Sequence, residues 1–170
     1  MMDTFEAVRT MLAVRSYEDR PVPEELVRRI VEAGHLSASS MNLQPWHFVV
    51  VQEHGTLRRL GELAKTGPYI AQAPLAIAVV IEDTRFAVSD ASRAIQSMML
   101  TAWSEGVGSN WVGFSGSLEG IKPLLGIPAD LDVLAVLPFG YPEEAVGRGK
   151  KNRKPLAEIA SRERYGQPYQ

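Results

Sequence analysis

The chain has 170 residues, 45% of them hydrophobic and 22% charged, so its composition is that of an ordinary globular domain. With 18 basic and 20 acidic residues the formal net charge is -2, which gives no overall attraction to nucleic acid or to an anionic membrane. Because the chain has no cysteine, disulfides, thiolate metal sites and a cysteine nucleophile are excluded.

No targeting or membrane segment is visible in the sequence. Residues 1–6 have neither the basic stretch nor the apolar core of a signal peptide. The longest uncharged apolar run, Pro74 to Ile81, is far shorter than the roughly 18 residues that suggest a membrane span. We therefore expect a cytoplasmic protein with no membrane partner, folded as one domain over residues 1–170.

The first predicted helix begins near the N-terminus. Asp3 followed by Glu6 has the spacing of a capping box, in which the side chain of each residue accepts a hydrogen bond from the backbone N–H of the other. Phe5, Val8 and Leu12 recur at helical spacing. We expect these three side chains to be buried.

A second helix and a first strand follow. Pro23 suits the first turn of a helix, and Gly34 is expected to end that helix. Residues Trp46 to Gln52 are rich in β-branched and aromatic side chains, which predicts a strand. The apolar stripe of the second helix consists of Leu26, Val27, Ile30 and Val31.

Helices and strands alternate along the rest of the chain. The strand predicted at Pro74–Glu82 is apolar throughout, which is typical of a central strand, and Ser89–Glu105 is the longest predicted helix. Together these elements predict an α/β or α+β protein with a sheet covered by helices. The remaining predictions are a helix at Leu57–Ala64, a strand at Ser109–Gly113, a weak helix at Ser117–Leu125, a strand at Val133–Phe139 and a helical turn at Leu156–Ala160.

Two common kinds of site are excluded by spacing. Gly106 and Gly108 begin like a dinucleotide-binding fingerprint, but Trp111 stands where the third glycine belongs, and the segment follows a helix. The 3 histidines do not have the spacing of metal ligands, so no metal site is predicted.

The segment from Ser39 to Phe48 combines hydroxyl and amide side chains with the start of a strand. Such a loop can offer backbone N–H groups and side-chain donors to a planar heteroaromatic ligand. The structural alternative is a turn capped by Asn42, with Trp46 in the core. The residues alone leave both interpretations open.

The polar extension 141–170 is basic, with 7 Lys or Arg against 4 Asp or Glu. Its cations, together with Arg15, are candidates for a phosphate site, because a phosphomonoester is held by two or three convergent cations. The alternatives are a solvated tail and a nucleic-acid contact. No aromatic residues alternate with the basic run 148–154, so we expect no nucleic-acid partner.

Four segments follow one another in a recognisable order. Residues 11–15 are Met-Leu-Ala-Val-Arg, followed by a Pro-Val-Pro helix start, and residues 38–46 are Ala-Ser-Ser-Met-Asn-Leu-Gln-Pro-Trp. Residues 106–113 are Gly-Val-Gly-Ser-Asn-Trp-Val-Gly, and residues 151–153 are Lys-Asn-Arg. In this order they resemble the nitroreductase family of flavin enzymes over nearly the whole chain.

The resemblance implies an α+β fold of three layers, with a central, mostly antiparallel sheet covered by helices and a C-terminal extension, 141–170, that exchanges with a dimer partner. It also implies an FMN-containing homodimer whose active sites are shared between chains. Hydride would come from NADH or NADPH, and electrons would pass by a ping-pong mechanism to a small acceptor such as a nitroaromatic or a quinone. Because the flavin supplies the redox chemistry, no catalytic side chain is expected.

The same resemblance assigns roles to residues of this chain. Arg15 would face the pyrimidine edge of the flavin or its ribityl-phosphate, and Val112 and Gly113 would lie along the ring through their backbone. Lys151 and Arg153 would hold the phosphate. The loop that reaches the flavin of the partner chain would contribute Ser39, Ser40 and Asn42.

One departure from the family pattern concerns the cluster before Arg15. The family has two arginines and a serine where this chain has Met11, Leu12 and Ala13. Losing a charged hydrogen bond costs about 1.5–3 kcal/mol, so FMN binding is expected to be weaker unless another cation such as Arg9 compensates. A flavin- or ligand-binding dimer of the same fold without turnover is the alternative function.

Overall fold

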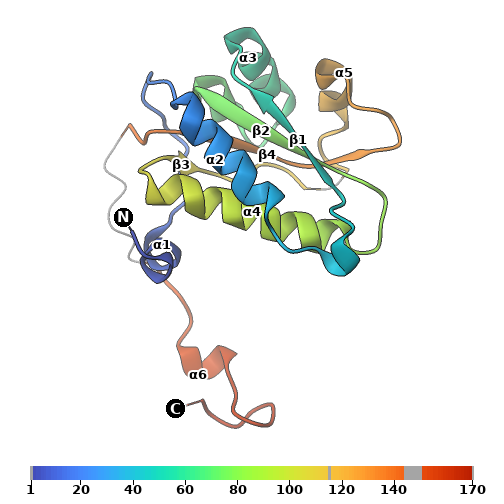
Figure 1. The fold of residues 1–170 in the computed structure, drawn as a ribbon. Helices are drawn as coiled ribbons and strands as arrows, with labels where there is room; N and C mark the ends of the chain where they lie inside the picture. The colour runs from blue at the N-terminus through green and yellow to red at the C-terminus, as the bar shows by residue number, and fades with distance from the viewer. Residues whose placement is uncertain (1, 115, 144–150, 170) are drawn as a thin grey trace.

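The computed structural model describes residues 2–114, 116–143 and 151–169. Its centre is a sheet in which β1 pairs with β2, β2 with β4, and β4 with β3, each pair antiparallel (Figure 1). The order β1-β2-β4-β3 leaves β1 at one edge of the sheet. The strands are β1 (Trp46–Val51), β2 (Leu75–Ile81), β3 (Gly108–Ser109) and β4 (Asp132–Gly140).

Strand β2 has the central position that its apolar sequence predicts. All of its residues are buried, and it pairs on one side with β1 (Phe48 opposite Val79) and on the other with β4 (Ala78 opposite Val136). Because side chains alternate along a strand, its larger residues, such as Ile77, lie in one apolar cluster while its alanines lie in the other. The sheet therefore has a hydrophobic core on both faces.

Helices cover both faces, so the predicted three-layer α+β fold is confirmed. One core lies under α2 (Glu24–His35) and α4 (Ala87–Ser104), and α1 (Thr4–Thr10) packs against α4. The opposite core lies under α3 (His54–Leu63) together with the shorter segments η2, η3 and α5. The bounds of those segments are η2 (Pro68–Gln72), η3 (Glu119–Ile121) and α5 (Lys122–Leu125).

The start of α1 is as predicted, but its buried face is not. The Asp3 side chain accepts a hydrogen bond from the backbone N–H of Glu6 at 2.8 Å, which caps the helix. Phe5 and Val8, however, are 75% and 45% exposed, so the prediction that they are buried is wrong for the single chain. The helix instead buries Ala7 and Thr10, the face that meets α4.

Two other element boundaries differ from the predictions. Gly34 does not end α2 but lies inside it, where a Cβ would come within 2.7 Å of the Met98 sulfur, so the glycine permits close helix packing. The strand predicted at Ser109–Gly113 is also shorter. Strand β3 ends at Ser109, and Val112 forms only an isolated bridge to β4.

The C-terminal segment 151–169 stands apart from the sheet and its helices. It includes the short helix α6 (Leu156–Ile159), and Figure 1 shows α6 and the C-terminus extending away from the body on the side of α1. Almost all of its residues are exposed. In the described part of the chain, no helix has the length and hydropathy needed to span a membrane.

Candidate functional site

The segment that carries Arg15 is fixed against β3. Ala13 forms a parallel bridge with Ser109, and the backbone N–H of Val14 donates to the Ser109 carbonyl oxygen at 3.0 Å. Val14 is buried, whereas Arg15 is exposed. Two segments nearly 100 residues apart in the sequence therefore lie side by side, and Arg15 directly follows the residue that is bonded to β3.

A hydrogen bond from a buried tyrosine also holds this segment. The Tyr17 hydroxyl donates to the Val14 carbonyl oxygen at 2.6 Å. Burial raises the pKa of the Tyr17 hydroxyl and the nearby Tyr69 adds to the rise, while the positive charge of Arg15 opposes it. The backbone of the segment is thus held from two sides, by β3 and by Tyr17, and Arg15 has a rigid base.

Val112 and Gly113 differ in what they can offer a ligand. The N–H and the carbonyl of Val112 are both bonded to Val136, at 3.0 and 2.9 Å, and its side chain is buried. Gly113 is half-buried with φ of +87°, and its carbonyl accepts from the Trp111 indole N–H at 2.7 Å. Gly113 is therefore the more exposed of the two, and Val112 is fixed to β4 beside it.

The predicted binding loop contains η1 (Ser40–Asn42) and an unusual backbone. Met41, Asn42 and Gln44 have φ of 54°, 56° and 52°, a region that costs non-glycine residues of the order of 1–3 kcal/mol each. The Ser39 hydroxyl oxygen accepts from the Gln44 backbone N–H at 3.0 Å. Asn42 is exposed, and its carbonyl accepts from the Gln44 side-chain amide at 3.1 Å.

Ser40, in contrast, is occupied within its own chain. Its backbone N–H and its hydroxyl both donate to the carboxylate of Asp90 in α4, at 2.8 and 3.0 Å. The Asp90 side chain is fully buried and also accepts from Arg93 at 3.2 Å. Sequence reasoning missed Asp90. The available signal was an acidic residue among the alanines on the buried face of a helix.

The two basic residues predicted to hold a phosphate, Lys151 and Arg153, lie at the start of the C-terminal segment 151–169. The Lys151 ammonium donates to the backbone carbonyl of Val8 in the last turn of α1, where carbonyls lack helical partners. Partial burial lowers the pKa of Lys151, and the charge of Arg153 lowers it further. Arg153 is exposed. The other cations of the run, Arg148 and Lys150, lie outside the described residues.

The segment leading to Arg15 and the Ser39–Gln44 loop lie at opposite ends of α4. At its C-terminal end, the Trp103 indole N–H donates to the Thr10 hydroxyl at 2.9 Å, which places α1 and the segment leading to Arg15 there. At its N-terminal end, Asp90 holds the Ser39–Gln44 loop. Asp90 and Trp103 lie about 20 Å apart at the rise of an α-helix, and Figure 1 shows α1 and the segment after α2 at opposite ends of α4.

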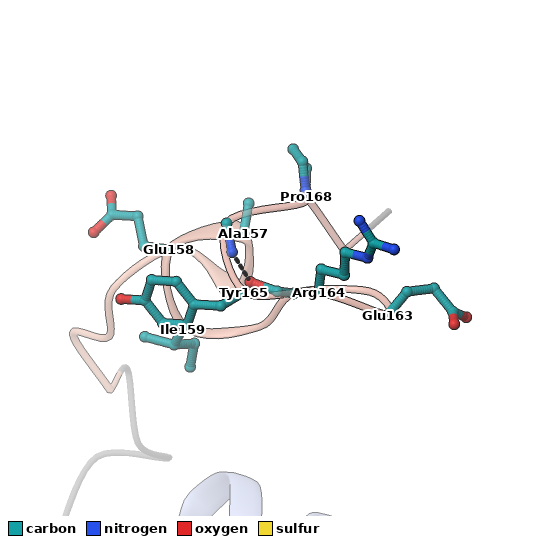
Figure 2. A pocket seen from close by; sticks show the side chains of 9 residues that line it. Ala157, Glu158, Ile159, Glu163, Arg164, Tyr165 and Pro168 are labelled. Atoms are coloured by element: carbon teal, nitrogen blue, oxygen red, sulfur yellow. Dashed lines mark hydrogen bonds between the residues drawn. The ribbon is translucent and has the colours of Figure 1, made fainter.

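A hollow in the C-terminal segment does not belong to either of these two regions. It measures about 430 Å³ and is lined only by residues between Ala157 and Pro168. Figure 2 shows the Arg164 and Glu163 side chains directed away from the loop rather than into it. In residues 2–114, 116–143 and 151–169, no set of three or more His, Asp or Glu side chains is arranged to hold a metal ion.

Comparison with known proteins identifies the family. The model of the nitroreductase family matches residues 9–85 and 65–141. A Methanothermobacter thermautotrophicus protein provisionally named NADH dehydrogenase/NAD(P)H nitroreductase is 37% identical over 154 residues, covering 86% of this chain and 81% of that protein. The chain belongs to the nitroreductase family. The family resemblance seen in the sequence is thereby confirmed, and the protein is an oxidoreductase of that family.

Two further relatives of this nitroreductase-family chain are informative. A Bacillus subtilis protein named FMN reductase [NAD(P)H] is 25% identical over 189 residues, covering 97% of this chain and 75% of that protein. A crystal structure from Parabacteroides distasonis, provisionally named NADH dehydrogenase/NAD(P)H nitroreductase, superimposes with a TM-score of 0.87 at 25% identity. The superposition covers 97% of this chain and 100% of the Parabacteroides distasonis chain. The fold is therefore that of the family along almost the whole length.

Proposed function

We propose that this nitroreductase-family chain is an FMN-dependent homodimeric oxidoreductase. NADH or NADPH is the electron donor, and a small nitroaromatic, quinone or similar molecule is the acceptor in a ping-pong reaction. The observation that supports the proposal is the docking of Val14 on Ser109, which fixes an exposed cation, Arg15, at the start of the segment 108–113. The name of the Bacillus subtilis relative, FMN reductase [NAD(P)H], supports the choice of cofactor and donor.

The residues at this place fit a flavin. Arg15 is exposed and forms no ion pair within the described residues, so its guanidinium is available to a negatively charged ring edge. Gly113 packs against the Leu118 side chain on the side where a Cβ would lie, so a ring would have to approach its backbone from the other side. When bound, FMN supplies the hydride and electron transfer itself. The work of Arg15 is to stabilise negative charge on the pyrimidine side.

Lys151 and Arg153 supply the charge that a phosphate needs. Partial burial lowers the pKa of Lys151 and the charge of Arg153 lowers it further, so a bound anion would offset both effects. The contact of Lys151 with Val8 fixes one of the two cations at the end of α1, close to the segment that leads to Arg15. One chain thus contributes a guanidinium, a backbone edge and two phosphate-binding cations to one flavin.

The Ser39–Gln44 loop belongs to a second site. Its anchor Asp90 lies about 20 Å along α4 from Trp103, which contacts α1, so we expect the loop not to reach the Arg15 segment of its own chain. A dimer in which this loop approaches the partner's Arg15 segment would complete both sites. The exposed apolar side chains of Phe5, Ile159 and Tyr165, with β1 at an open sheet edge, support an exchange of C-terminal extensions between chains.

The alternative is a dimer of the same fold that binds a ligand without turnover. It is favoured by the residues that replace the family's basic cluster. Met11 packs against the core beneath α4, and Arg9, the candidate replacement cation, is held by Glu6 through two hydrogen bonds of 2.7 and 2.8 Å. The chain therefore lacks the two arginines that its family pattern provides before Arg15.

A spectrum of the purified protein distinguishes these functions. The oxidoreductase is expected to be yellow as isolated or after addition of FMN, and NADPH or NADH under anaerobic conditions should remove the flavin absorbance. Yellow protein that neither nucleotide reduces supports the ligand-binding alternative. Colourless protein that cannot be reconstituted with FMN contradicts both the cofactor and the proposed reaction. The mass of any co-purifying small molecule identifies the ligand in each case.

A further inference from the structure

A buried carboxylate holds the Ser39–Gln44 loop in place. Asp90 is 0% exposed, and one of its oxygens accepts the Ser40 N–H at 2.8 Å while the other accepts the Ser40 hydroxyl at 3.0 Å. The charge of Asp90 is balanced by Arg93, 3.2 Å away, and by its place in the first turn of α4, where the helix dipole favours a negative charge. Hydrogen bonds to a charged group are stronger than neutral ones.

The loop needs such an anchor because its backbone is strained. Met41, Asn42 and Gln44 all have positive φ. Conformations of this kind persist only where surrounding contacts determine them. A second hydrogen bond lies at the base of the loop, where the Ser37 hydroxyl donates to the Ser97 hydroxyl at 2.8 Å. The hydrogen bonds to Asp90, in contrast, hold the strained tip of the loop.

The hydrogen bonds to Asp90 also determine which polar groups of the loop remain available to a ligand. Both donors of Ser40 are committed to Asp90, so Ser40 has no donor to offer a ligand. The Ser39 hydroxyl only accepts, from Gln44, so its proton remains available, and the exposed Asn42 side chain projects from the same tip. The loop therefore has a fixed inner residue and free neighbours on either side of it.

We propose that Asp90 is a positioning residue of the flavin site, with Ser40 as its anchor in the loop rather than as a ligand contact. This rests on the proposed function, because the site in question is the FMN site of the partner chain. Asp90 holds Ser39 and Asn42 in the geometry in which they meet the ligand. The strained loop is thereby ordered before the flavin arrives, which lowers the entropy lost on binding.

The test compares Ser40→Ala, Ser40→Thr and Asp90→Asn with Ser97→Ala in the full-length dimer. FMN affinity is measured by fluorescence titration, and hydrogen exchange of the loop amides is measured in flavin-free protein. Ser40→Ala and Asp90→Asn are expected to weaken FMN binding about tenfold or more, to speed exchange across 39–44, and to change the visible circular dichroism of bound flavin. Ser40→Thr keeps both donors and should restore affinity.

Ser97→Ala is the matched control, because it removes one hydrogen bond between the same loop and the same helix, at the base instead of the tip. It is expected to leave FMN affinity within about threefold of wild type. If Asp90→Asn does not fold, the Ser40→Ala and Ser40→Thr pair decides the question alone.

Three results would overturn the inference. Weaker FMN binding by Ser40→Ala with unchanged loop exchange would make Ser40 a direct ligand contact. Faster loop exchange with unchanged FMN affinity would make the anchor purely structural, as would an equal loss of affinity in Ser97→Ala. A wild-type protein that binds no FMN refutes the proposed function instead. That result is recognised before any variant is compared.

Discussion

The backbone N–H of Val14 lies 3.0 Å from the carbonyl oxygen of Ser109, and this hydrogen bond joins the N-terminal segment to the edge of the sheet. Gly108 makes the contact possible, since a Cβ there would lie 2.3 Å from Val14 Cγ2. The position of Arg15 relative to β3 therefore depends on the absence of a side chain at Gly108.

Gly108→Ala is expected to push Val14 away from β3. Overpacking of this kind destabilises a protein by about 1–3 kcal/mol, and the shift should also weaken FMN binding because Arg15 moves with the segment. Urea unfolding and FMN titration measure the two effects. Gly120→Ala is the control, because its Cβ would meet only Leu63 at 3.6 Å. Wild-type behaviour of Gly108→Ala in both measurements would contradict the role of this contact.

Arg153→Ala tests the phosphate site. Loss of one charged hydrogen bond to phosphate costs about 1.5–3 kcal/mol, so the FMN dissociation constant should rise roughly ten- to a hundredfold. The thermal midpoint of the flavin-free protein should not change, because Arg153 is exposed. Arg164→Ala removes another exposed cation of the same segment and should bind FMN normally. Unchanged FMN affinity in Arg153→Ala refutes the phosphate role.

Subunit mixing tests whether each site uses residues of both chains. Ser39→Ala and Arg153→Ala homodimers are each expected to bind FMN weakly. In a heterodimer of the two, one site holds both defects and the other holds neither, so about half of the sites should recover. A heterodimer of wild type with Arg153→Ala sets the maximum recovery. If verified mixed dimers show no recovery, the sites are not shared in this way.

Glu53 makes stability depend on pH at the start of α3. Hydrogen bonds from the N–H of Gly55 and from the hydroxyl and N–H of Thr56 lower the pKa of this carboxyl. Because the pKa is lower in the folded state, the stabilisation is complete above the ordinary carboxyl pKa and is lost as the pH falls through the folded value.

Glu53→Gln should therefore melt at a lower temperature than wild type near neutral pH, and the difference should shrink as the pH is lowered. Thermal unfolding between neutral and acidic pH measures it. Glu32→Gln, at an exposed carboxylate of α2, is the control and should follow wild type throughout. A difference for Glu53→Gln that grows toward acidic pH would contradict the assignment.

The sequence correctly predicted those elements that depend only on neighbouring residues. The unbroken apolar run of β2 predicted its central place, because a strand with both faces buried has no polar face to alternate. The Asp3 cap depends on a neighbour three residues away, and the structure has it as predicted. The four ordered motifs identified the family, which the family model then confirmed.

The roles predicted for Gly34 and Ser40 were wrong or incomplete because these roles depend on residues distant in the sequence. Whether Gly34 ends a helix or admits a neighbour depends on Met98, which a different helix brings to it. Whether Ser40 is free for a ligand depends on Asp90, 50 residues further along the chain. Neither partner is visible in the local pattern.

The sequence by itself determined the family, the three-layer α+β fold and which residue types are available to a flavin and its phosphate. Only the tertiary structure decided that the segment before Arg15 is bonded to Ser109, that Ser40 is bound to Asp90, and that the Ser39–Gln44 loop lies at the other end of α4. The physical reason is that periodicity and capping act over a few residues. Hydrogen bonds between distant segments exist only after the chain has packed.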